Sequence, residues 1–238
     1  MAIRAFFAAP VTDYLAALQR CYPGRGVAWI LPVIFGLALS WWLYVPLHEL
    51  LHAAGCELAG CEVTRLEIAP EYGGVVLQHL FPFVTPSSEY AGRLSGFDTH
   101  GNDAIYLVTV FFPYLLTLFV GVLLLRLAAS AQLSRPARCL LLGGALPIAY
   151  APFISLPGDY YEMGSIIVSR GWSEAAVQRW RGDDLFKLTG GLFSDNEIQI
   201  IDVAGISMSA VVGILLAFLT YWLGVQWARW LRTCSRSR

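Results

Sequence analysis

Four stretches of the chain run for about twenty residues or more without a charged side chain, the length that a helix needs to cross a bilayer core. They are residues 27–47, 104–125, 139–158 and 204–228. The composition agrees, because hydrophobic residues make up 57% and charged residues 14% of the chain, against about 45–50% and about 25% in soluble domains. The sequence therefore predicts an all-α polytopic membrane protein with about four transmembrane helices.

The basic residues divide unevenly between the two sides that these four spans define. Ten of the sixteen Lys and Arg residues lie on the side of the N-terminus, and they are Arg4, Arg20, Arg25, Arg126, Arg135, Arg138, Arg229, Arg232, Arg236 and Arg238. Basic residues in short loops stay in the cytoplasm. We therefore expect both termini inside, in a bilayer that is most simply the bacterial inner (cytoplasmic) membrane. The net charge of −1 gives no indication of a nucleic-acid partner.

The segments outside the spans have patterns of their own. Residues 1–20 have the apolar spacing of an amphipathic helix at the membrane surface. Residues 63–77 alternate around Gly73-Gly74, which predicts a small extracytoplasmic β-hairpin. In the second outer loop, the Ser194–Glu197 spacing is that of a helix capping box, and we expect two short interfacial helices there. No repeat divides the chain, so residues 1–238 are expected to form a single membrane-embedded domain.

The five cysteines include no CxxC pair, which argues against a thiolate zinc site or a thioredoxin-like motif. Cys56 and Cys61 lie close together in a predicted outer loop. They can form a disulfide if that loop is extracytoplasmic, and two unpaired thiols remain the alternative.

A metal-binding motif, His48-Glu49-Leu50-Leu51-His52, stands at the end of the first expected span. In a helix the two histidines lie one turn apart on the same face, so both can ligate one Zn²⁺ while Glu49 stands beside the bound water. Zinc lowers the pKa of such a water toward 7, and a neighbouring carboxylate can accept its proton. Chance placement would give about 0.0025 such motifs in a chain of this composition.

A structural role for the same residues is the competing interpretation. His48 and His52 would then be interfacial histidines at a helix end, hydrogen-bonded to carbonyl groups that Pro46 leaves free. Ionisable groups at a membrane helix are costly to retain without a function, which favours the metal site.

A catalytic zinc site also needs a third protein ligand and an open position. Asp159, just after Pro157-Gly158, is the first candidate, and Glu162 is the alternative. Both follow the third expected span, on the same side of the bilayer as His48. The outer-loop residues His79, His100, Asp98 and Asp103 are further candidates, and either histidine could instead stabilise an oxyanion.

These residues resemble the site-2-protease-like intramembrane zinc metalloproteases. The resemblance covers the motif at 48–52, the segment 63–77 and residues 152–159, and it implies a peptidase that cuts membrane-embedded or juxtamembrane segments, with a sheet edge that pairs with an extended substrate. The chain departs from that pattern in having Leu51 before the second histidine and Tyr160 after the aspartate, where the family usually has glycine. Its site is also expected on the extracytoplasmic side.

The sequence thus predicts a membrane zinc metallopeptidase with His48, His52 and Asp159 (or Glu162) as ligands and Glu49 as general base. Its expected partners are the lipid bilayer and a membrane protein or peptide substrate. Two alternatives remain: a zinc hydrolase of lipid or acyl bonds, and a metal-binding or transport protein without catalysis.

Overall fold

The structure is a computed structural model that describes residues 3–22, 24, 26–194 and 198–236. It divides into two compact units. The first comprises Met1–Ala151 together with Tyr221–Arg238, and the second comprises Pro152–Thr220. Each unit is described separately below.

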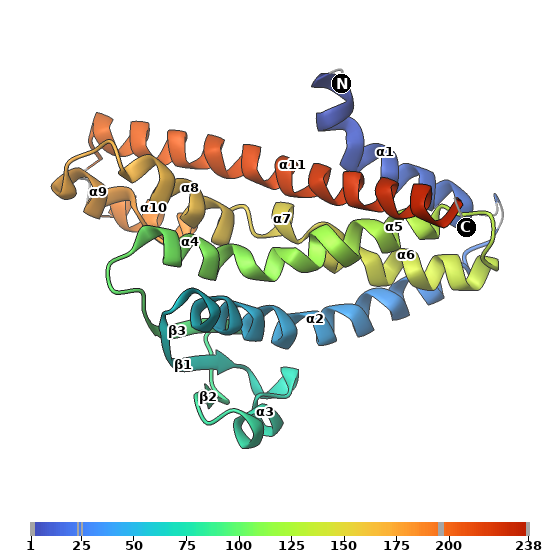
Figure 1. Cartoon of the computed structure of the whole chain (residues 1–238), viewed down its shortest axis with the longest axis horizontal. Helices are drawn as coiled ribbons and strands as arrows, with labels where there is room; N and C mark the ends of the chain where they lie inside the picture. The colour runs from blue at the N-terminus through green and yellow to red at the C-terminus, as the bar shows by residue number, and fades with distance from the viewer. Residues whose placement is uncertain (1–2, 23, 25, 195–197, 237–238) are drawn as a thin grey trace. The chain divides into compact units, whose positions relative to one another are not determined.

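The first unit contains most of the helices and the sheet (Figure 1). Its helices are α1 (Ile3–Cys21), α2 (Ile30–Ala59), η1 (Pro70–Tyr72), α3 (Gly74–Leu80), α4 (Asp103–Phe111), η2 (Phe112–Tyr114), η3 (Thr117–Gly121), α5 (Val122–Ala128) and α6 (Arg135–Ala149). The following helices are α7 (Ala151–Ile154), α8 (Asp159–Ser169), α9 (Glu174–Trp180), α10 (Leu185–Ser194) and α11 (Ile200–Arg236), the last of which ends in the first unit.

Among the residues that the structure describes, three helical segments are long and apolar enough to cross a membrane, which indicates a membrane protein. They are Ile30–Ala59, Asp103–Ala128 and Ile200–Cys234. Each contains most or all of one expected span. The expected span at 139–158 is divided instead: α6 ends at Ala149, the short α7 follows, and a turn precedes α8. Prolines at 147, 152 and 157 explain the division, because proline removes a helical hydrogen bond and clashes with the preceding turn.

Glycines bring α2 and α6 into backbone contact. A Cβ atom on Gly36 would overlap the Leu140 carbonyl oxygen, and one on Gly143 would overlap the Val33 carbonyl oxygen. The Ser40 hydroxyl donates a hydrogen bond to the Gly144 carbonyl at 2.6 Å. Such close approach is how apolar helices associate in lipid, where burial of hydrophobic surface gives no driving force. These contacts pack the N-terminal half of α2 closely against α6.

The sheet lies beside the C-terminal half of α2 (Figure 1). Its strands are β1 (Glu62–Ile68), β2 (Val84–Thr85) and β3 (Gly92–Asp98), in the order β2-β1-β3. β1 pairs in parallel with β2 and antiparallel with β3. The buried side chains of Leu66, Ile68 and Val84 pack with Ala53 of α2. This cluster fixes the sheet against the helix that carries the motif.

The expected hairpin at 63–77 is therefore wrong in its second strand. Gly73 does reverse the chain, with a φ of 84° that favours glycine. However, residues 74–80 form α3, and the antiparallel partner of β1 is β3. A short apolar run such as Val75-Val76-Leu77 does not distinguish a strand from a helix. Here Leu77 packs against the buried cluster of the sheet from the helix α3.

The surface helices follow the sequence expectations in part. α1 is helical as expected, and its side chains at Ile3, Phe7, Val11 and Leu15 are exposed along one face. Asp13 of α1 forms an ion pair with Arg126 of α5 at 3.2 Å, which holds α1 against α5. Short helices are present between residues 159 and 203 as expected, and they include α9 and α10. However, Ser194, the first residue of the expected capping box, ends α10 and does not begin a helix. Residues 195–197 of that box lie outside the described residues.

Candidate metal centre

The motif lies within α2, which continues past it to Ala59. His48 and His52 are both buried, with 8% of each residue exposed. Their Nε2 atoms face one another at 3.1 Å. Zn–N bonds of about 2.0–2.1 Å in tetrahedral geometry place two ligand nitrogens about 3.3–3.4 Å apart. The two imidazoles are therefore arranged as a pair of metal ligands requires.

The outer nitrogen of each imidazole has its own partner. The Nδ1 of His52 lies 2.9 Å from the Thr109 carbonyl oxygen. A carbonyl can only accept, so His52 Nδ1 donates and its Nε2 keeps a lone pair for a metal. The Nδ1 of His48 lies 2.7 Å from the Tyr44 hydroxyl. Partners of this kind fix the orientation of metal-binding histidines.

The surroundings of the histidines are buried and aromatic. Tyr114 is fully buried, and its ring centroid lies 5.4 Å from that of His48. The hydrogen bonds of the two histidines include Thr109 of the neighbouring helix α4 and the Tyr44 hydroxyl one turn earlier. This pattern differs from the alternative interpretation, in which carbonyls freed by Pro46 would hold the histidines at a helix end.

The two candidate third ligands both lie on α8 of the second unit. Asp159 is the first residue of this helix, and Glu162 is buried one turn later. Two imidazoles and a carboxylate are a donor set typical of metal sites in hydrolases.

Glu49 follows His48 on α2 and is partly buried. Its side chain lies directly against Gly92, the first residue of β3: a Cβ atom on Gly92 would overlap Glu49 Cγ and lie 3.0 Å from Cδ. The sheet thus covers the carboxylate that the motif places beside the metal ligands.

The remaining outer-loop candidates lie apart from the two histidines. His79 is exposed on α3. His100 is exposed beside Asp98, with 3.5 Å between its Nδ1 and the Asp98 carboxylate. Asp103 begins α4. Within the described part of the chain, none of these residues forms a metal-binding group with His48 and His52.

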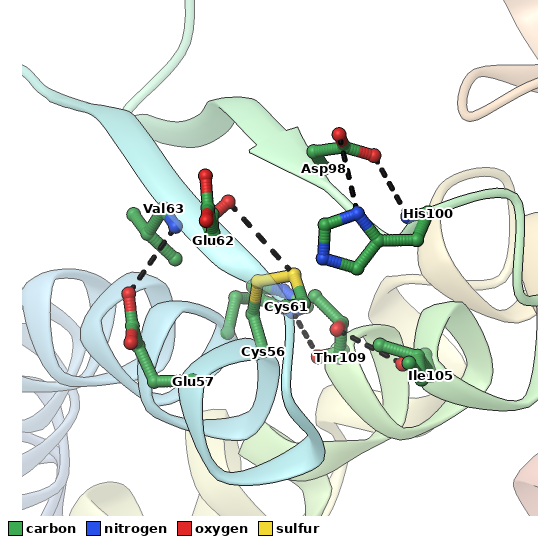
Figure 2. Close-up of a disulfide and its surroundings, with 10 residues drawn as sticks. Cys56, Glu57, Cys61, Glu62, Val63, Asp98, His100, Ile105 and Thr109 are labelled. Atoms are coloured by element: carbon green, nitrogen blue, oxygen red, sulfur yellow. Dashed lines mark hydrogen bonds and ion pairs between the residues drawn. A yellow bond between two sulfur atoms is a disulfide. The ribbon is translucent and has the colours of Figure 1, made fainter.

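A disulfide fastens the end of α2. Cys56, one turn beyond His52, is bridged to Cys61, just before β1 (Figure 2). Gly60 ends the helix with a φ of 88°, and its N–H donates to the Cys56 and Glu57 carbonyls. The Val63 N–H donates to the Glu57 carboxylate at 3.2 Å. The connection between α2 and β1 is therefore held by a disulfide and by a hydrogen bond.

The sequence did not indicate three residues of the site, namely Tyr44, Thr109 and Gly92. Tyr44 stands four residues before His48, a spacing that could have suggested a partner on the same face. Thr109 contributes its backbone, which carries no side-chain signal.

No protein-family model, curated protein or solved structure matches the chain.

Proposed function

We propose that the chain is a membrane-embedded zinc metallopeptidase that hydrolyses peptide bonds of membrane-associated or juxtamembrane substrates. The observation that carries this proposal is the pair of buried imidazole Nε2 atoms 3.1 Å apart, with a glutamate as the next residue after the first histidine. His48, His52 and Asp159 are its ligands. When bound, zinc supplies Lewis acidity, which polarises a carbonyl group and lowers the pKa of a water molecule.

The residues of the chain supply the rest of the chemistry. The Tyr44 hydroxyl and the Thr109 carbonyl hold the two imidazoles in the ligating orientation. Glu49 accepts a proton from the attacking water and returns it to the leaving amine, as a general base and then a general acid. Buried aromatic rings around His48 limit the entry of further water and strengthen these electrostatic interactions.

The sheet supports a peptide as the substrate. β3 lies at the edge of the sheet and begins at Gly92, against Glu49. An extended peptide can add to an exposed strand edge through main-chain hydrogen bonds. A peptide paired with β3 would bring its backbone to the general base, and recognition would depend on backbone more than on side chains.

An orientation with both termini in the cytoplasm and the site toward the extracytoplasmic side agrees with two independent features. The first is the ten-to-six division of basic residues. The second is the state of the cysteines. Cys56 and Cys61 are bridged, whereas Cys21 and Cys139 are buried thiols, and the Cys139 Sγ atom lies 3.9 Å from the Cys21 carbonyl oxygen. Disulfides persist in oxidising compartments and thiols in the cytoplasm. The bacterial inner membrane is the simplest setting.

Metal content tests the ligand set. Purified protein is expected to carry about one zinc per chain, because two imidazoles and a carboxylate suit Zn²⁺ better than Mg²⁺ or Ca²⁺. His48→Ala and His52→Ala should lose it, and Asp159→Asn should weaken retention more than Glu162→Gln. Elemental analysis that finds no transition metal in the wild-type protein would end the proposal. Loss from Glu162→Gln alone would reassign the third ligand.

Glu49→Gln tests catalysis separately from metal binding. The substitution keeps the size of the side chain and removes the base, so zinc content should remain while turnover falls by about 10²–10⁴-fold. Cleavage of membrane peptides and of lipid or acyl esters would be assayed in parallel on protein in detergent or vesicles. Full activity in the variant contradicts the mechanism. If the wild-type protein cleaves only esters, the proposed substrate changes from a peptide bond to a lipid or acyl bond. If it retains zinc but hydrolyses neither substrate, the result favours a metal-binding protein without catalysis.

A further inference from the structure

Gly92 is the residue of the sheet that lies closest to the proposed general base. It pairs with Ile68 of β1, whose side chain is fully buried toward α2. Partners in register share a face of the sheet, so a side chain at position 92 would also point toward α2. There a Cβ atom would overlap Glu49 Cγ, and it would lie 3.3 Å from the Glu67 carbonyl oxygen.

The collision would fall on the stem of Glu49 and not on its mobile end. Rotations about χ2 and χ3 leave the Cγ atom in place, and only a change of χ1 moves it. In a helix, χ1 is largely restricted to two rotamers. The other allowed rotamer therefore carries the whole carboxylate to a different place.

The strand is less free to yield than the side chain. β3 is paired with β1 from Glu62↔Asp98 to Ile68↔Gly92. Leu94 packs with the buried cluster that joins the sheet to α2. Moving β3 outward far enough to admit a methyl group would break pairing and packing together. The rotamer change of Glu49 is the cheaper response.

We infer that Gly92 is a positioning residue for Glu49: the absent side chain at the start of β3 keeps the Glu49 carboxylate in the rotamer used for proton transfer. The inference rests on the proposed role of Glu49 as general base. It makes the sheet part of the catalytic apparatus in addition to a surface for substrate pairing.

Gly92→Ala tests the inference, with Gly96→Ala as a matched control on the same strand. A Cβ atom on Gly96 would lie 2.5 Å from Thr64 Oγ1 and 2.8 Å from Arg65 Cβ, so this control strains the sheet without touching Glu49. Gly92→Ala should lower kcat by about 10²-fold or more, a large share of the general-base contribution, with zinc content unchanged. Gly96 lies on the strand that is proposed to pair with the substrate, so Gly96→Ala should act mainly on KM, and its kcat should fall far less than that of Gly92→Ala.

A double-mutant cycle shows whether Gly92 acts through Glu49. In a Glu49→Gln background, Gly92→Ala should cause no further loss of kcat, since the base is already gone. Wild-type kcat in Gly92→Ala, or an equal loss in both backgrounds, would overturn the inference.

Cross-linking tests the contact without any assay of activity. Glu49→Cys combined with Gly92→Cys should form a disulfide under mild oxidation, because the two Cβ atoms are expected within bonding range. Glu49→Cys with Gly96→Cys should not, since four residues of strand separate the positions by about 13 Å. Peptide mapping by mass spectrometry identifies the bridge. An unbridged 49–92 pair overturns the inference. If the 49–92 bridge forms but the wild-type protein hydrolyses no substrate, only the proposed function is overturned.

Discussion

At the scale of single residues, the site depends on groups that hold the ligands as much as on the ligands. Tyr44 lies one turn before His48, and its hydroxyl bonds the imidazole nitrogen that faces away from His52. In a buried setting this bond restricts rotation of the ring. A tyrosine in an apolar helix is usually an interfacial anchor, and for that reason the sequence alone did not distinguish this one.

Tyr44→Phe should weaken metal binding by about 10–100-fold, the usual effect of losing a hydrogen-bond partner of a metal-binding histidine. Titration with a competing chelator would measure the affinity. Tyr72→Phe is the control, because it removes a hydroxyl that accepts a hydrogen bond from Trp41 at 3.2 Å, away from the histidines. Equal affinities in both variants would show that Tyr44 does not orient His48.

At the scale of elements, the sequence predicted what depends on local spacing and missed what depends on distant packing. The i, i+4 spacing of His48 and His52 was sufficient to place them together on a helix face. The partner of β1 could not be read in this way. It is β3, which is separated from β1 in the chain by η1, α3 and β2. Likewise, the absence of charge in 139–158 predicted a span, but its prolines divide the segment.

The contact between α2 and α6 gives a prediction at this scale. Gly143→Ala should destabilise the protein by about 1–3 kcal/mol, because the new methyl group meets the α2 backbone at Val33 and Leu37. Gly144→Ala should be neutral or stabilising, since its Cβ would lie 3.8 Å from the Gly36 carbonyl oxygen and helix propensity improves. Unfolding by denaturing detergent, followed by circular dichroism, compares the two. Equal stability would contradict the close packing.

At the scale of the whole molecule, the five cysteines can be used to test which side of the membrane each segment faces. Burial and the neighbouring Cys139 raise the pKa of the Cys21 thiol to about 12. At neutral pH this thiol is almost entirely protonated and therefore unreactive. Cys234 is exposed near the C-terminal end of α11. Among the described residues, it is thus the cysteine outside the disulfide that is most exposed to reagents.

Labelling with a membrane-impermeant maleimide should follow this arrangement. Cys234 should react only after the cells are opened, because the C-terminus is expected in the cytoplasm. A Ser87→Cys variant should react in intact cells, since Ser87 is exposed on the loop between β2 and β3. Cys234→Ser controls for background labelling. The opposite pattern would place the site on the cytoplasmic face, as in the site-2-protease-like enzymes that the motif resembles.

The contact between Ser40 and Gly144 also limits how early α2 can pack against α6 during synthesis of the chain. The two residues are separated by 104 positions, and a ribosome adding about 5–20 residues per second needs about 5–20 s to pass from one to the other. During that interval α2 has already been made, but its surface at Gly36 has no α6 to pack against. Lipid chains or the insertion machinery must contact this surface first and leave when α6 is made. The helix that carries the histidines therefore reaches its final packing late.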